Sequence, residues 1–362
     1  MPWTRPLELD PTLPGASADA LAGRGIAPPR RPAPGARSSV LAWAVAVYAV
    51  AATALLAAGW FLGDVTWWLY AANVSVIYWL APLVPLLLLA LLRRWWPVAA
   101  ICAVGAAVWL ATFGPMLVPR SVAADDTLRV ASYNIAPQRD VDHVARMVQR
   151  EQPDVLLVQE LLPAAREDLI RLLPSLPHHH FSQVNQGAPG GGGTAVLSRL
   201  PIVGVAGVTD LPATSRPIDI VTLEAGGGST FDVASLHLAS PCSECTEENP
   251  TGSLEEALER EAAVRGVEAD RLADALPART VVLGGDLNSS TFNDPRRRLL
   301  DAGLVDVHRQ VGTAPGFTRT NWRGRFRIDW LFVSPEVVPV REWVGPDDGS
   351  DHRPVIADIA LP

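Results

Sequence analysis

The stretch VVLGGDLN, residues 281–288, is an apolar run that ends in a carboxylate and a carboxamide, Asp286 and Asn288. The same arrangement recurs along the chain. RVASYNI carries Asn134 near its end, DVLLVQE ends at Glu160, FDVASLH ends at His237, FRIDW contains Asp329, and SDHRP contains Asp351 and His352. One polar residue after a strand is usually a cap or turn residue. A repeated series of them predicts a common cleft lined by strand ends.

The surrounding pattern predicts an α/β fold with more strands than helices. Amphipathic helices are expected at 141–152 and 254–276. Short β-rich runs between turn residues predict strands at 128–135, 154–161, 194–200, 218–223, 230–238, 280–287, 328–333 and 355–361. Because some neighbouring strands are joined by short loops, the pattern favours a two-sheet sandwich with outer helices over a doubly wound parallel sheet.

The acidic members of this series suit a metal site. Glu160, Asp286 and Asp351 offer hard oxygen ligands, which fit Mg²⁺, Mn²⁺ or Ca²⁺ rather than zinc. Asn134 and Asn288 can hydrogen-bond a phosphoryl oxygen or a nucleophile without adding negative charge. A hard cation with positioned donors stabilises the charge that develops during in-line displacement at phosphorus.

The remaining members suit proton transfer and phosphate binding. His237 and His352 can donate to a phosphate or move protons near neutral pH. A carboxylate such as Asp329 can fix the tautomer of one histidine and favour its charged form. The sequence therefore predicts hydrolysis of a phosphate ester.

The order N…QE…H…GDxN…D…SDH resembles the endonuclease/exonuclease/phosphatase superfamily, which includes DNase I-like nucleases, sphingomyelinase-like enzymes and inositol-phosphate phosphatases. The resemblance covers about residues 128–361. It implies a DNase I-like, four-layer α/β sandwich of two β-sheets flanked by helices. It also implies that Glu160 is the main metal ligand, with Asn134 and Asp351 close to the metal.

The same resemblance implies roles for the other residues. Asp286 would orient or deprotonate the attacking water, with Asn288 beside it. His237 and His352 would contact the scissile phosphate, and Asp329 would pair with His352. Some family members pair the first histidine with an acidic residue, and the sequence identifies no such partner for His237.

The N-terminal third has a different composition. Residues 1–38 are rich in Pro, Ala, Gly and Arg and are predicted to be a disordered tail. Three apolar segments follow at 39–62, 65–92 and 97–118, each long enough to cross a bilayer as a helix. The predicted organisation is therefore a tail, a three-helix transmembrane anchor over 39–118, and a catalytic domain over 119–362.

Arginines set the expected orientation of this anchor. They precede the first span and separate the second from the third, whereas the connection at Gly63-Asp64 has no positive charge: Arg24, Arg30, Arg31, Arg37, Arg93 and Arg94. The positive-inside rule places the N-terminus in the cytoplasm and the catalytic domain outside the cell membrane. Because no span contains an ionisable acidic or basic residue, an anchor is favoured over a transporter.

Three functions stay open at this stage. The first is an extracytoplasmic phosphodiesterase or phosphatase acting on phosphate esters, including lipid-linked ones. The plan of a few spans before an outward domain resembles bacterial membrane proteins associated with teicoplanin-type resistance. The second is a membrane-tethered extracellular nuclease, which the net charge of −8 disfavours because polyanion binding depends on basic contacts. The third is a non-catalytic scaffold that binds phosphate ligands.

Four further motifs have plain interpretations. Cys242 and Cys245 are expected to form a local disulfide or to remain two free thiols. The glycine-rich run 187–194 precedes a strand rather than a helix, which favours a flexible loop over a phosphate cradle. The tract 178–180 of three histidines is expected to be a solvated loop. A basic loop with Arg319, Arg323, Arg325 and Arg327 recruits an anionic substrate, lies on anionic lipid headgroups, or is a solvated face.

Overall fold

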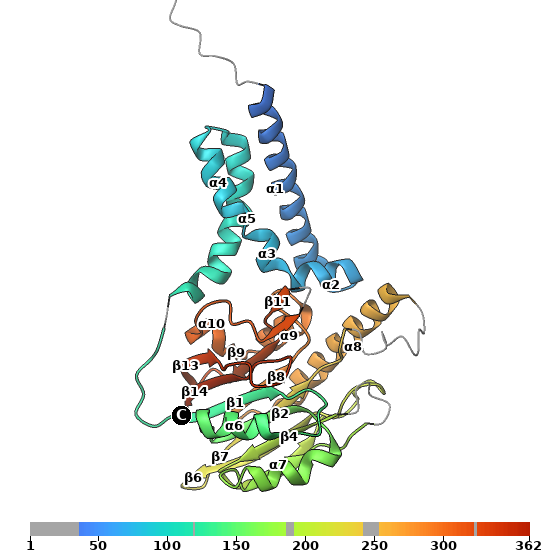
Figure 1. Ribbon diagram of the computed structural model, residues 1–362, viewed down its shortest axis with the longest axis vertical. Coiled ribbons are helices and arrows are strands. Elements are labelled where there is room, and N and C mark those ends of the chain that lie inside the picture. Colours follow the sequence, from blue (N-terminus) through green and yellow to red (C-terminus); the bar gives the residue numbers. More distant parts are fainter. Residues whose placement is uncertain (1–35, 119, 186–191, 242–252, 322–323) are drawn as a thin grey trace, which may run out of the picture. The chain divides into compact units, whose positions relative to one another are not determined.

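Two six-stranded mixed sheets form the centre of the sandwich (Figure 1). The computed structural model describes residues 36–118, 120–185, 192–241, 253–321 and 324–362. Almost all of the predicted tail, the Cys242/Cys245 pair and most of the glycine-rich run lie outside these residues, so the predictions made for them stay predictions.

The first sheet has the strand order β13-β14-β1-β2-β4-β3. Its strands are β1 (Leu128–Asn134), β2 (Val155–Leu161), β3 (His178–Phe181), β4 (Gly193–Ser198), β13 (Val338–Val344) and β14 (Val355–Ala360). The second sheet has the order β5-β6-β7-β8-β12-β9. Its strands are β5 (Ile202–Gly207), β6 (Asp219–Gly226), β7 (Ser229–His237), β8 (Val281–Asp286), β9 (Val305–Asp306) and β12 (Asp329–Val333). A separate ribbon pairs β10 (Arg319–Asn321) with β11 (Gly324–Phe326).

Each large sheet contains one parallel pair, β1 with β2 and β7 with β8, and its other neighbouring strands are antiparallel. The strands of a parallel pair end at the same edge of their sheet. Asn134 and Glu160 therefore come at one such edge, and His237 lies directly opposite Asp286 at the other. The predicted site residues therefore lie at the ends of these apolar strands.

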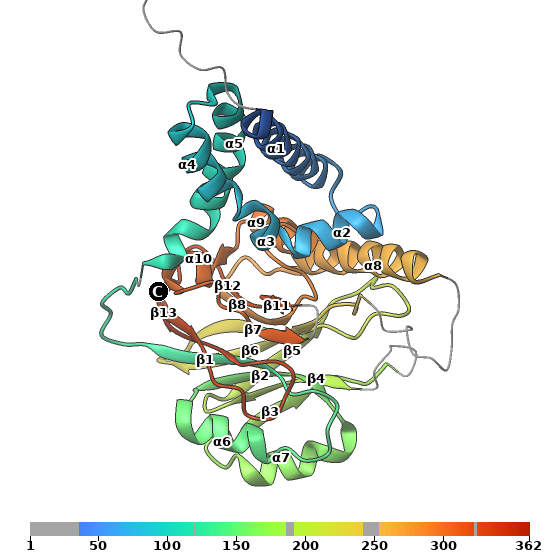
Figure 2. The ribbon, with the colours of Figure 1, turned by 45° about the horizontal axis from the view of Figure 1, so that its top comes forward.

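Three apolar clusters hold four layers together (Figure 2). Valines and leucines of both sheets fill the space between the sheets. Helices α6 (Asp142–Glu151) and α7 (Arg166–Leu172) cover the outer face of the first sheet. On the second sheet, α8 (Leu254–Ala275) and α9 (Asp294–Asp301) contribute Leu272 and Leu299 to the outer cluster. The predicted four-layer sandwich is confirmed.

The apolar N-terminal region differs from its prediction. Two helices in the described chain are long and apolar enough to cross a membrane alone, Ser39–Leu62 and Trp96–Leu117. They correspond to α1 (Ala36–Leu62) and to α5 (Trp96–Phe113) with its short extension η2 (Gly114–Leu117). The predicted middle helix over 65–92 is wrong as one continuous helix. It comprises α2 (Trp67–Val74), α3 (Val76–Leu80) and α4 (Leu83–Leu92), with a bend of 69° after Val74.

The bend has a local and a tertiary cause. The Ser75 hydroxyl donates to the carbonyls of Ala71 and Ala72, in competition with the helical hydrogen bonds. α2 also packs on α8, and the Trp67 backbone N–H donates to Glu259 of that helix at 3.1 Å. The helix therefore bends, and α2 contacts the sandwich. Val45–Pro362 is one compact unit, so these contacts belong to the fold.

Two predicted loops contain regular structure. The three histidines at 178–180 are not a solvated loop but part of edge strand β3, where His180 Nε2 lies 2.8 Å from Asp219. Of the basic loop, Arg319 begins β10 and Arg325 lies in β11. Arg327 is buried and donates to Glu342 at 2.5 Å, so it is not part of a solvated face.

Candidate active site

Asp286 is the centre of a buried polar cluster at the ends of the two parallel pairs. Its Oδ2 accepts a hydrogen bond from Asn134 Nδ2 at 3.1 Å. The Nε2 atoms of His237 and His352 lie 3.9 and 3.7 Å from the same oxygen. Its Oδ1 accepts the Asn288 backbone N–H at 2.7 Å. The GDLN segment thus holds a carboxylate whose two oxygens have different partners.

A close backbone approach explains why glycine precedes this carboxylate. Gly285 has a φ of 155°, and a Cβ at this position would lie 1.9 Å from the carbonyl oxygen of Leu236 on β7. Only glycine fits there without moving one strand away from the other. Gly285 therefore keeps β7 and β8 close enough for His237 to reach Asp286.

Glu160 reaches the cluster through a local break in strand geometry. Strict alternation along β2 would point Glu160 away from Gln159, toward the face that α6 and α7 cover. The pairing of β2 with β4 shifts register between Val158 and Leu161, and Glu160 has a φ of 63°. Such conformations in non-glycine residues cluster at functional sites. Here the irregularity brings the Glu160 carboxylate to 3.0 Å from Asn134 Nδ2 and 3.6 Å from His237 Nε2.

The second histidine has its own carboxylate partner. His352 Nδ1 lies 2.8 and 3.1 Å from the two oxygens of Asp329. Asp329 is the first residue of β12 and pairs in register with Asp286. Ser350 connects His352 to β1, because its hydroxyl donates to the Asn134 carbonyl at 2.8 Å and accepts the His352 N–H at 3.1 Å. The predicted pair of Asp329 and His352 is present.

The pKa values of the two histidines shift in opposite directions. Burial lowers the pKa of His237 well below its usual value, and the positive charges of Arg216, His352 and Arg319 add to this effect. Burial also opposes the charged form of His352, but the carboxylates of Asp329 and Asp286 outweigh it and raise its pKa to about 9. At neutral pH, His237 is therefore neutral and His352 is cationic.

Asp286 is itself perturbed. Burial raises its pKa to about 7, the negative charge of Asp329 acts in the same direction, and the charge of His352 opposes both. A carboxyl group with a pKa near neutrality is suited to accept a proton from water.

The structure brings together seven of the eight predicted site residues. Asp351 is the exception, because its side chain is 51% exposed and its carboxylate pairs with Arg319 at 2.9 Å. It belongs to neither group of potential metal ligands among the described residues, which are Glu160/His237/Asp286 and Asp286/Asp329/His352. The prediction that Asp351 lies close to a metal remains a prediction.

Two arginines that are not part of the strand-end series lie beside the site. Arg216 is 7% exposed, and its charge is felt by His237 and Asp286. Burial opposes the charge of Arg319, but Asp351 and Asp286 raise its pKa above the usual value. Neither follows an apolar strand, which is why the strand-end pattern missed them. Arg319 also forms an isolated β-bridge with His352, and only the fold reveals this neighbour.

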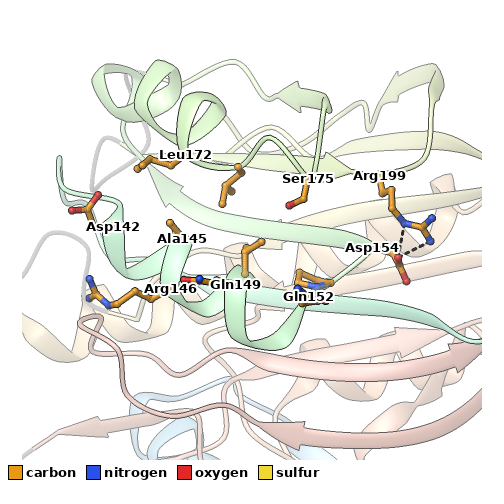
Figure 3. A pocket seen from close by; sticks show the side chains of 12 residues that line it. Asp142, Ala145, Arg146, Gln149, Gln152, Asp154, Leu172, Ser175 and Arg199 are labelled. Carbon is orange, nitrogen blue, oxygen red and sulfur yellow. Dashed lines mark hydrogen bonds and ion pairs between the residues drawn. The ribbon is translucent and has the colours of Figure 1, made fainter.

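A hollow on the opposite side of the first sheet is separate from this site. It lies beside α6 and α7, and Figure 3 shows Asp142, Gln149 and Ser175 around it, with Arg199 paired to Asp154 at its edge. None of the predicted site residues lines it. The candidate active site is therefore the cluster at the strand ends and not this hollow.

Comparison with known proteins agrees with this geometry. Residues 130–352 match the model of the Endonuclease/Exonuclease/phosphatase family. The chain belongs to the endonuclease/exonuclease/phosphatase family. No curated protein matched the sequence.

Several solved structures share the family fold. The chain is similar to an endonuclease/exonuclease/phosphatase from Beutenbergia cavernae, with 22% identity, a TM-score of 0.52, and coverage of 66% of this chain and 72% of that one. The catalytic domain of human Nocturnin with a bound sulfate gives 18% identity, a TM-score of 0.50, and coverage of 67% and 98%. A family protein from Leptotrichia buccalis gives 18% identity and a TM-score of 0.50, with coverage of 65% of this chain and 100% of that one.

The donor set fits the divalent cation that endonuclease/exonuclease/phosphatase enzymes typically use. Glu160 and Asp286 present carboxylate oxygens, which hard cations prefer. Asp286 is fully buried beside a second acid, and these two effects raise its pKa although His352 and Arg319 carry positive charge nearby. A divalent cation would add positive charge beside the carboxylates. Glu160 is the partly exposed member, with a side-chain exposure of 25%.

Proposed function

We propose that this protein is a membrane-anchored phosphoesterase that depends on Mg²⁺ or a similar hard cation and acts outside the cytoplasm. The observation that carries the proposal is the convergence of Asn134, Glu160, His237 and His352 around the single carboxylate of Asp286. Family membership supports a phosphate-ester substrate.

Glu160 would hold the cation, with Asn134 close to it. When bound, the cation would neutralise negative charge on a phosphoryl oxygen and help to align it for displacement. Asn134 Nδ2 donates to both carboxylates and so keeps them at a fixed separation. Ligands held by such outer hydrogen bonds lose little free energy to reorganisation.

The other residues would carry the proton and stabilise the developing charge. Asp286 would accept a proton from the attacking water as the water oxygen bonds to phosphorus and the ester P–O bond breaks, and the leaving oxygen would take a proton from solvent. The Asn288 N–H keeps the Asp286 carboxylate oriented. His352, held cationic by Asp329, donates from Nε2 to a phosphoryl oxygen. His237 is neutral and can donate one hydrogen bond without adding a charge that would repel the cation.

The membrane region supports substrates presented at a bilayer surface. Two helices are long and apolar enough to span, and up to three segments span if the bent pair over 67–92 crosses as one. With three crossings, the arginine distribution favours an outward catalytic domain. The β10–β11 ribbon, which begins with Arg319, contacts α3 of the apolar region. Tyr78 accepts the Arg325 N–H, donates to the Arg325 carbonyl at 2.5 Å, and stacks on Phe317. This contact joins the ribbon that carries Arg319 to the apolar segment, which supports a substrate phosphate near the bilayer surface.

The test is hydrolysis by the full chain in nanodiscs, with Mg²⁺, on a panel of phosphate esters. The panel contains a lipid-linked diphosphate, a phospholipid, a soluble aryl phosphodiester, a monoester and plasmid DNA. Release from lipid-linked or soluble esters that is lost in Glu160→Ala supports the proposal. Plasmid cleavage alone, lost in the same variant, would move the assignment to a tethered nuclease. Metal binding without any hydrolysis would favour a phosphate-binding scaffold.

A further inference from the structure

We propose that the segment 63–74, which lies between the first span and the helix bend, supports the active site. Its residues Tyr70 and Asp64 position the loop that follows Asp286. This inference rests on the proposed function, because it gives residues 63–74 a role in that reaction in addition to their place in the anchor. The loop in question spans residues 287–293, between β8 and α9.

Tyr70 contacts the catalytic loop directly. Its hydroxyl donates to the backbone carbonyl of Asn288 at 3.1 Å, and the residue is 7% exposed. The guanidinium of Arg265 lies over the Tyr70 ring at 4.6 Å, and Arg265 Nη1 donates to the carbonyl of Ala239 at 2.9 Å. Ala239 follows His237 by two residues. Tyr70 is therefore connected to the chain beyond both β7 and β8 (Figure 2 shows α2 beside α8).

Asp64 fixes the far end of the same loop. One of its oxygens accepts from the side-chain amides of Asn73 and Asn293 at 2.8 and 2.9 Å. The other accepts the backbone N–H of Asp294, the first residue of α9, at 2.9 Å. Asp64 thus satisfies an N–H at the start of α9 from a distant part of the chain, as an N-cap side chain does locally. The residue is 5% exposed, so its hydrogen bonds are shielded from water.

The conformation of Asn288 explains why this docking concerns catalysis. Asn288 has a φ of 49°, in the left-handed region that is uncommon for residues other than glycine and that asparagine adopts more readily than most. Its N–H orients Asp286, and its carbonyl accepts from Tyr70, so the two peptide groups that flank its Cα are both held. On the next residue, the Ser289 carbonyl accepts from Trp330 Nε1 at 2.8 Å. Without the Tyr70 hydroxyl, Asn288 can relax and release the N–H that holds Asp286.

The test compares two tyrosines that each donate to a backbone carbonyl. Tyr70→Phe removes the bond to Asn288. Tyr48→Phe removes a bond of 2.5 Å to the Trp79 carbonyl, which lies within the apolar helices and away from the site. In full-length protein with saturating Mg²⁺ and a soluble aryl phosphodiester, Tyr70→Phe should lower kcat by about five- to tenfold with KM unchanged. Tyr48→Phe should leave both constants unchanged.

Hydrogen–deuterium exchange gives a readout that does not need activity. Backbone amides in 287–293 should exchange faster in Tyr70→Phe and in Asp64→Asn than in wild type, and not in Tyr48→Phe. Unchanged kcat and unchanged exchange in both variants would overturn the inference, as would a lower melting temperature without a change in kcat. If wild type hydrolyses none of the esters, the proposed function fails, whereas faster exchange in 287–293 would still support the docking.

Discussion

His237 and His352 are both buried, and their Nε2 atoms lie 3.9 and 3.7 Å from the same oxygen of Asp286, yet their pKa values move in opposite directions. The difference lies in their second ring nitrogens. His352 Nδ1 pairs with Asp329, whereas His237 Nδ1 is buried without a hydrogen-bond partner among the described residues. Burial alone favours the neutral ring, and a neighbouring carboxylate reverses that preference. One half of the site is therefore suited to a cation, and the other carries a positive charge itself.

Removal of the divalent cation should have the largest effect. Chelation is expected to lower kcat/KM by more than about 10³-fold, because the Glu160 carboxylate would then repel the phosphoryl group instead of holding a cation that neutralises it. Activity should return on addition of Mg²⁺ or Mn²⁺. The measurement is ester hydrolysis by chelated protein across a metal titration. Full activity in excess chelator would contradict the distinction between the two halves.

Loss of the shared carboxylate should come next. Asp286→Asn keeps the size of the side chain but removes the proton acceptor, so kcat should fall by about 10²–10⁴-fold. A matched control is Asp168→Asn, which makes the same change of charge on exposed α7, where Asp168 pairs with Arg171 at 2.6 Å. That variant should retain wild-type kcat. Equal activity in both variants would remove Asp286 from the centre of the site.

The two histidines themselves provide the sharpest comparison. His352→Gln removes a cationic donor and should lower kcat by about 10²–10³-fold. His237→Gln should lower kcat less, by about tenfold, and should raise the Mg²⁺ concentration needed for half-maximal activity. Kinetics at graded Mg²⁺ concentrations separate the two effects, with melting temperatures as the folding control. A reversed order of kcat losses would contradict the assigned charges.

The sequence predicted the strands that end at this site better than it predicted the edge strands of the two sheets. The strands expected at 128–135 and 280–287 are confirmed as β1 and β8 to within one residue at each end, because each is a buried apolar run bounded by turn residues. β5 was missed because most of its residues are exposed, so no apolar run marks it. β3 was read as a loop because three histidines hide its pairing with β4. Edge strands carry a weaker pattern because one side of each has no neighbour.

Residue types were predictable at the site, whereas orientation was not. The strand-end pattern found Glu160, but its side chain reaches the cluster only through a register shift and a positive φ that no spacing rule indicates. Asp351 follows the same pattern, yet its side chain is half exposed and pairs with Arg319. The bend after Val74 was missed for a similar reason, since hydropathy measures length and polarity but not a contact with α8. These features depend on tertiary contacts.

A change of Asp329, the partner of His352, should have the smallest effect on kcat. It tests whether the positive charge of His352 comes from this carboxylate. Asp329→Asn removes the carboxylate that keeps the ring charged, so the pKa of His352 should fall from about 9 toward its usual value. Because the reactive form is the protonated one, activity that persists up to about pH 9 in wild type should be lost at a lower pH in the variant, with about a tenfold loss of kcat near neutrality. The measurement is kcat against pH at saturating Mg²⁺. Asp219→Asn, which breaks the partly exposed pair with His180, is the control and should leave the profile unchanged. An alkaline limb that stays in place in Asp329→Asn would mean that the charge of His352 does not come from Asp329, and the two halves of the site would then differ for another reason.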